Sequence, residues 1–313
     1  MNLVNMNLSK KNNSKTLLAM IFLVTGLLSD ADHAQATGTV HDKEYWRAII
    51  ADDFAPPAEV PIASLVNELS GYLSSTDPDL RDGIAYSILT QWLYVKKVVP
   101  PDLRRDLIDN WTANLRQGIG ESDTDSVLKR SFSALMLSVT AALDNEAPYL
   151  ERQEFDSLLQ SALRYLHDEQ DTRGFEPTQG WLHSVAHTAD LLKFLGRSRH
   201  LSVSEQTAVL NAISDKMSRV DHVLVHGEDE RLARVVLSIA ARPDVDMQAL
   251  QVFLAVLKPV RSAEGPSLQS LAANQNRKNL AVSLFALLNT DSRDFESLRT
   301  TREEVLGLLR TMM

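Results

Sequence analysis

The chain has 313 residues, a formal net charge of −9 and no cysteine, so disulfide bonds and thiolate metal sites are excluded. Its acidity and its low aromatic content of 6% argue against nucleic acid as a partner and against docking on anionic lipid, both of which need basic surfaces. A chain of this length can bury a large hydrophobic core.

Residues 1–36 are predicted to be a cleavable secretory signal peptide. Lysines precede an apolar run over residues 16–28, and Ala34-Gln35-Ala36 supplies a small-residue cleavage site. The run is shorter than the roughly 20 residues that a transmembrane helix needs, which leaves an uncleaved anchor as the alternative. We therefore expect an exported protein, periplasmic or secreted, without stable membrane insertion after cleavage. Residues 37–313 are expected to form a single all-α domain.

Helical periodicity runs through the rest of the chain, and no convincing strand pattern interrupts it. Apolar residues recur every three or four positions in about a dozen segments, which predicts amphipathic helices. The segments are 41–53, 61–74, 77–96, 101–117, 125–144, 151–167, 178–195, 202–219, 228–241, 244–257, 266–288 and 291–312, the last with a potential break at Thr300.

Helix-boundary residues agree with these segments. Asp77-Pro78 offers an N-cap followed by proline at the first helical position, Ser202 to Glu205 forms a capping box, and Gly196 is typical of a helix C-terminus. Because the connections are short, successive helices should pack as antiparallel pairs. This favours a HEAT-like α/α superhelix or solenoid, with a globular helical bundle as the alternative. No fixed-period sequence repeat is evident.

The segment from Gly180 to Asp190 carries the strongest candidate site. It contains His183, His187 and Asp190 at positions i, i+4 and i+7, which would share one face of a helix. This polar face is separate from the apolar stripe of the same segment. In a stack of helical hairpins, such a face can line a groove.

Three interpretations of these residues remain open. Two imidazoles four residues apart can chelate a divalent metal, but further donors would have to come from Asp171, His226, Glu228 or Asp229, and no His-Glu-x-x-His pattern is present. Alternatively, the three side chains belong to a buried polar network that specifies helix packing. The third option is a ligand or catalytic site without metal, in which a histidine acts as base.

Other polar clusters are candidates for the same unit. Asp77 to Gly83 opens a helix with three carboxylates and Arg81, and its helical glycine suggests the close approach of another backbone. Arg130 lies among apolar residues and should have a carboxylate partner, with Asp79, Asp82 and Asp171 as candidates. The cluster from His226 to Arg231 is typical of a solvated helix N-terminus.

Several of these segments together resemble a bacterial family, domain of unknown function 2785. The resemblance rests on Asp77–Tyr86, Arg130–Leu135, Asp171–Phe175, Gly180–Asp190 and, more weakly, Glu228–Ala233. It spans about residues 77–233 and supports treating the clusters as one unit. Where Phe175 stands, relatives are expected to have tryptophan. The resemblance implies no particular reaction.

The sequence contains no glycine-rich nucleotide loop and no Gly-x-Ser-x-Gly elbow, which argues against nucleotide-dependent enzymes and common serine hydrolases. We expect a module that binds a small molecule, a peptide or another exported protein. Metal-dependent hydrolysis through His183, His187 and Asp190, with a divalent metal as cofactor, is one alternative, and a structural scaffold is the other. The expected ligand-contacting residues are His183, His187, Asp190, Arg81, Asp82, Arg130, Asp171, Arg173 and Trp181.

Overall fold

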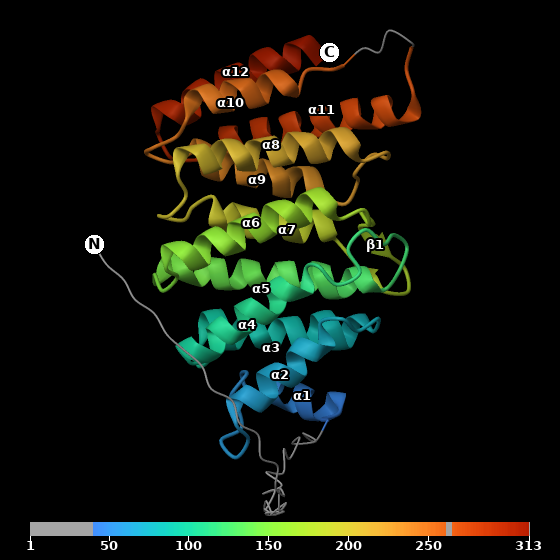
Figure 1. Cartoon of the computed structure of the whole chain (residues 1–313), viewed down its shortest axis with the longest axis vertical. Coiled ribbons are helices and arrows are strands. Elements are labelled where there is room, and N and C mark those ends of the chain that lie inside the picture. Colours follow the sequence, from blue (N-terminus) through green and yellow to red (C-terminus); the bar gives the residue numbers. More distant parts are fainter. Residues whose placement is uncertain (1–39, 261–264, 313) are drawn as a thin grey trace, which may run out of the picture. The chain divides into compact units, whose positions relative to one another are not determined.

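The computed structural model describes residues 40–260 and 265–312, and α-helices dominate this part of the chain (Figure 1). The predicted signal peptide lies outside the described residues. The twelve α-helices found within them are α1 (Lys43–Ala51), α2 (Ile62–Tyr72), α3 (Ser87–Thr90), α4 (Pro101–Asn114), α5 (Ser126–Glu146), α6 (Arg152–Asp168), α7 (Ser184–Leu195), α8 (Val203–Arg219), α9 (Glu228–Ala240), α10 (Met247–Val256), α11 (Leu268–Thr290) and α12 (Glu296–Met312). The prediction of an all-α protein is confirmed.

The short helix α3 is the middle of a longer helical rod. Two wider, π-helical segments flank it, η1 (Asp79–Tyr86) and η2 (Gln91–Val95), so the rod covers most of the predicted segment 77–96. Helix α12 continues through Thr300 without a break. Within the described residues, no helix is both long and apolar enough to cross a membrane.

From α5 onward the helices form two rows, in which most helices pack on the next but one along the chain. Helices α5, α7, α9, α11 and α12 contact one another in succession, and α6, α8 and α10 form a second such row. The rows meet where α6 packs on α7, α8 on α11 and α10 on α12. Helix α4 and η2 cover α5 from its other side, so α5 is buried almost all round, as expected for a helix that is apolar on most faces.

The predicted helix 178–195 is wrong over its first six residues. Phe175–Glu176 (β1) and Gly180–Trp181 (β2) form a two-stranded antiparallel ribbon instead. The next backbone amides also pair with the opposite segment, Leu182 N donating to Gly174 O at 2.8 Å and His183 N to Arg173 O at 3.2 Å. These hydrogen bonds take the donors that a helix would use, so α7 begins only at Ser184.

The glycine in η1 has a different role from the one expected. A Cβ atom added to Gly83 would lie 3.3 Å from Asp79 Oδ1, and within 4 Å it would meet no backbone atom of another segment. The expected approach of another backbone is therefore wrong. The glycine leaves room for the Asp79 carboxylate one turn earlier on the same rod.

Candidate functional site

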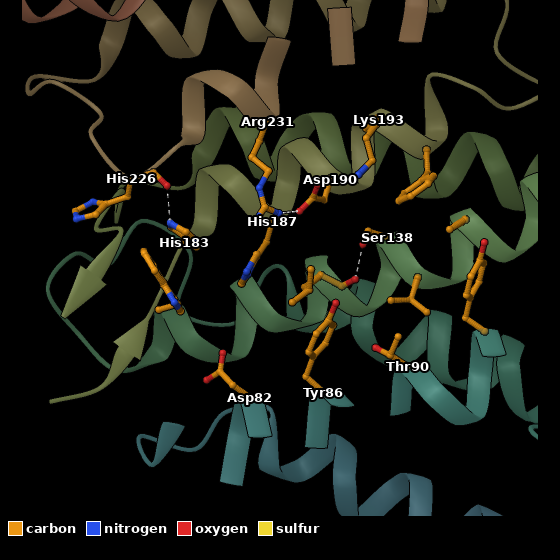
Figure 2. A pocket seen from close by; sticks show the side chains of 16 residues that line it. Asp82, Tyr86, Thr90, Ser138, His183, His187, Asp190, Lys193, His226 and Arg231 are labelled. Atoms are coloured by element: carbon orange, nitrogen blue, oxygen red, sulfur yellow. Dashed lines mark hydrogen bonds and ion pairs between the residues drawn. The ribbon is translucent and has the colours of Figure 1, made fainter. Parts of the chain in front are cut away.

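A pocket of about 690 Å³ lies between the helical rod, α5, α7 and the start of α9 (Figure 2). We call it the His187 pocket. Its lining comprises Asp82, Tyr86, Thr90 and Tyr94 from the rod, Leu135, Ser138, Val139 and Ala142 from α5, Trp181 from β2, His183 before α7, His187, Asp190, Lys193 and Phe194 from α7, and His226 and Arg231 from the α9 region.

Five of the nine predicted contact residues line this pocket: His183, His187, Asp190, Asp82 and Trp181. The first three lie together along this pocket, but their geometry differs from the predicted helical face. His183 stands just before the helix in the left-handed conformation, with φ 51° and ψ 37°, and its carbonyl accepts the hydrogen bond from His187 N at 2.9 Å. Only the other two residues are helical.

The hydrogen bonds of His187 fix its tautomer. Ser131 Oγ lies within hydrogen-bond distance of both Leu182 O and His187 Nδ1, the latter at 2.8 Å. Because a carbonyl only accepts, the single hydroxyl proton goes to Leu182 O, and His187 Nδ1 must donate to the serine oxygen. The lone pair of this imidazole is therefore on Nε2. That atom has no hydrogen-bond partner among the described residues.

His183 and His187 are both neutral near pH 7. Burial lowers the pKa of His187 well below its usual value, and burial lowers that of His183 to about 4. His183 Nε2 lies 3.1 Å from His226 O, so it carries the proton of that ring and donates it to the carbonyl. Trp181 stacks on the His183 ring with centroids 4.3 Å apart, which holds the imidazole in place.

Asp190 holds two cations at one wall of the pocket. Its Oδ1 accepts from Lys193 Nζ at 3.0 Å, and its Oδ2 accepts from Arg231 (Figure 2). Lys193 also lies over the Phe194 ring, 4.3 Å from its centroid. The carboxylate is buried while 42% of the Arg231 side chain is exposed. Two cations thus share one carboxylate, with N–H groups still available to a ligand.

The opposite wall carries a row of polar side chains from the rod. Tyr86, Thr90 and Tyr94 follow one another at four-residue spacing, and Asp82 precedes them by one turn. Thr90 Oγ1 is buried without a hydrogen-bond partner among the described residues. Burial raises the pKa of Asp82, whose Oδ2 lies 2.7 Å from Arg81. Burial also raises the pKa of Tyr86, so its phenol stays protonated.

The remaining four predicted contact residues do not line the pocket. Arg81 is fully buried and donates to the carbonyl oxygens of Gln179 at 2.7 Å and Trp181 at 3.2 Å, which fixes β2 against the rod. Its role is to position the strand that carries the tryptophan.

Arg130, Asp171 and Arg173 belong to a cluster behind the pocket that we call the Arg130 network, together with Glu169. Arg130 pairs with Glu169 through two hydrogen bonds of 2.6 and 3.1 Å, and Glu169 also accepts from Asp171 N. The expected partners for Arg130 are therefore wrong. Glu169 follows the end of α6 directly, and nothing in its sequence neighbourhood announces a buried carboxylate.

Asp171 and Arg173 pair with each other within this network. Arg173 donates from Nε and from a terminal nitrogen to the carboxylate, at 2.9 and 2.6 Å, and Asp171 Oδ2 also accepts from Asp123 N. The carbonyl of Asp171 accepts from the Ser184 hydroxyl at the start of α7. The network thereby fixes where α7 begins, and it contacts no open space of the His187 pocket.

The donors expected of a metal site do not converge. Within residues 40–260 and 265–312, no three side chains of His, Asp or Glu are placed to share one ion. The rings of His183 and His187 meet edge to face with centroids 5.7 Å apart, and both Asp190 oxygens are occupied by cations. Of the remote donors considered, only His226 reaches the pocket. The residues present do not fit a resident divalent metal.

Several lining residues were not predicted. Tyr86, Thr90 and Tyr94 could have been found from their four-residue spacing, which puts three hydroxyl groups on one helical face. Arg231 lies in a cluster interpreted as a solvated helix N-terminus, but its side chain on α9 pairs with Asp190 on the adjacent helix α7. Ser131 does not line the pocket, and it also gave no signal, because its hydrogen bond to His187 depends on the packing of α5 against α7.

His226 requires a glycine beside it. A Cβ atom added to Gly174 would lie 2.2 Å from His226 Nδ1 and 2.8 Å from its Cβ, so only glycine leaves space for this ring. The ring also meets Trp181 at a centroid distance of 6.0 Å. Gly174 thus shapes the end of the pocket without lining it.

Comparison with known proteins gives one informative result. No curated protein and no solved structure matches the chain. A family model described as "Protein of unknown function (DUF2785)" matches residues 115–286, which include α5 to α9 and the pocket residues that they carry. The rod with Asp82 and Tyr86 lies outside the matched residues. Because the match covers more than half of the chain, the protein belongs to this family.

Proposed function

We propose that the protein binds a small polar molecule in the His187 pocket. The observation that carries the proposal is the unprotonated Nε2 of His187, an acceptor without a partner among the described residues, in a pocket of about 690 Å³. Because His187 lines the pocket, a ligand that donates a hydrogen bond to this nitrogen would complement it.

Binding fits His187 better than proton transfer does. A general base works best when its pKa is near the working pH, but burial lowers the pKa of this imidazole well below its usual value. The partner of its Nδ1 is a serine hydroxyl instead of a carboxylate, so no anion stabilises the imidazolium. We therefore assign His187 the role of hydrogen-bond acceptor.

The two alternative functions have less support. A metal-dependent hydrolase needs converging donors, which the described residues lack. A structural scaffold accounts for the Arg130 network, where the charged groups are paired. It does not account for an acceptor left without a partner at an accessible pocket.

The proposal is tested by thermal shift with a panel of sugars, sugar acids, amino acids and dicarboxylates. Asparagine at position 187 can still donate to Ser131 from the place of Nδ1 but offers no acceptor in the place of Nε2. We expect at least one compound to raise the Tm of the wild type and not that of His187→Asn. His222→Ala, an exposed histidine outside the pocket, is the matched control and should respond like the wild type. A panel without any stabilising compound, or an equal response of His187→Asn, contradicts the proposal.

We also propose export, as the pattern of residues 1–36 predicts. Expression of the full chain in a Gram-negative host, followed by fractionation and N-terminal sequencing, tests it. The expected product is periplasmic or secreted and begins at Thr37. A cytoplasmic product that retains residues 1–36 contradicts export.

A further inference from the structure

We infer that the ligand of the His187 pocket is an acidic sugar, a uronate or a short oligosaccharide that contains one. This inference rests on the binding function proposed above and names the class of ligand. Three independent features of the pocket support it: the charge at one wall, the hydroxyl-matching groups at the other, and the exposed indole of Trp181.

The charged side chains of Asp190, Lys193 and Arg231 at one wall of the pocket favour an anionic ligand. Four charged residues line the pocket, and Asp82 is already matched by Arg81 behind it. That leaves Lys193 and Arg231 against the single carboxylate of Asp190. Among the described residues, the Arg231 guanidinium hydrogen-bonds only to Asp190, so its other N–H groups are available. A guanidinium and an ammonium side by side are suited to a carboxylate.

The remaining polar groups of the pocket favour a ligand with several hydroxyl groups. His187 Nε2 can only accept, the Tyr86 phenol can donate, and the buried Thr90 hydroxyl can do either. A simple carboxylic acid satisfies only the cations. A ring with several hydroxyl groups can donate to His187 and also pair with the rod.

Trp181 supplies a flat surface for the ring. One face of its indole stacks on His183, and the Phe175 ring meets it at a centroid distance of 4.9 Å. The residue is 42% exposed and lines the pocket. The apolar face of an aromatic ring beside polar groups matches a sugar, whose C–H faces are apolar and whose edge is polar. A volume of about 690 Å³ is sufficient for one or two sugar rings.

The inference is tested by calorimetric titration of the full protein with glucuronate, galacturonate and digalacturonate, each beside glucose or galactose as its uncharged counterpart. We expect the acids to bind at least about tenfold more tightly than the neutral sugars. Arg231→Gln should weaken the binding of the acids by about tenfold and leave that of neutral sugars unchanged. Lys193→Gln should act in the same direction.

Arg234→Gln is the matched control, because Arg234 lies three residues further along α9, pairs with exposed Glu230 and does not line the pocket. It should bind the acids like the wild type. Equal affinity for charged and neutral sugars, or no binding of any sugar, overturns the inference. In that case another compound that stabilises the wild type but not His187→Asn leaves the binding function intact, whereas its absence defeats both.

Discussion

The His187 pocket and the Arg130 network are both built from buried polar side chains on adjoining helices, yet they differ in one respect. In the network, the charged groups of Arg130, Glu169 and Asp171 meet a partner inside the fold. In the pocket, His187 Nε2 and Thr90 Oγ1 have none among the described residues. Hydrogen-bonding atoms that lack a partner in the fold therefore indicate a candidate site better than buried charged groups do.

The largest effect should come from the network. Arg130→Ala leaves the buried Glu169 carboxylate without the cation that hydrogen-bonds to it, so we expect the free energy of unfolding to fall by about 3–5 kcal/mol. Urea denaturation measures it. Lys129→Ala, on the half-buried neighbouring residue whose ammonium hydrogen-bonds to Gln117, is the control and should lower stability by about 1 kcal/mol or less. A small loss for Arg130→Ala would mean that the network is not structural.

The pocket should instead give the protein a dependence on pH. The pKa of His183 is about 4 in the folded protein and has its ordinary value of 6.5 in the unfolded chain. Between pH 6.5 and pH 4 the unfolded state therefore binds a proton at this residue that the folded state does not bind. Stability is therefore full above pH 6.5 and declines as the pH falls toward 4, by about 2–3 kcal/mol from this residue.

His183→Gln keeps a donor for the His226 carbonyl but cannot titrate. We expect the loss of unfolding free energy between pH 7 and pH 4.5 to be smaller in this variant by that amount, measured in urea at both pH values. Because the other titrating groups are the same in both proteins, the difference between the two losses reports His183 alone. Identical pH dependence in variant and wild type would place His183 in a more solvated environment.

Gly174→Ala tests how closely the pocket end is packed. The added methyl group displaces His226, and we expect a destabilisation of about 1–3 kcal/mol together with weaker ligand binding. Gly71→Ala is the control, because a Cβ there meets nothing within 4 Å and lies in helix α2. A neutral Gly174→Ala, judged by Tm and titration, would show that the ring moves aside freely.

The smallest change in stability is expected for Trp181→Ala, since the indole is partly exposed. We expect a cost of about 1 kcal/mol from the lost stacking on His183, but a loss of ligand binding that Val203→Ala, an exposed residue elsewhere, does not cause. Unchanged binding by Trp181→Ala would show that the indole does not contact the ligand.

The fold was more predictable from sequence than the site. Apolar periodicity locates each helix, because helix burial leaves a local pattern that holds from 41–53 through 291–312. The segment 178–183 misled because its polar and apolar residues follow helical spacing while Gly180 and the ribbon pairing determine its backbone. Propensity within one segment does not report hydrogen bonds to another.

The pocket depends on contacts between distant segments. His187 and Asp190 were found because they lie on one helix, but Tyr86 comes from a rod about 100 residues earlier and Arg231 from α9. The partner of Arg130 likewise follows a different helix, at Glu169. Local spacing can identify such residues as candidates, but the packing of the helices determines which of them come into contact.

The hydrogen bonds from Arg81 to Gln179 and Trp181 have a consequence for dissecting the molecule. They make the ribbon dependent on a side chain from outside the family-matched residues 115–286. A fragment cut to those boundaries would lose both the wall with Tyr86 and the clamp that holds the indole. The proposed ligand site thus extends beyond the residues that match the family model.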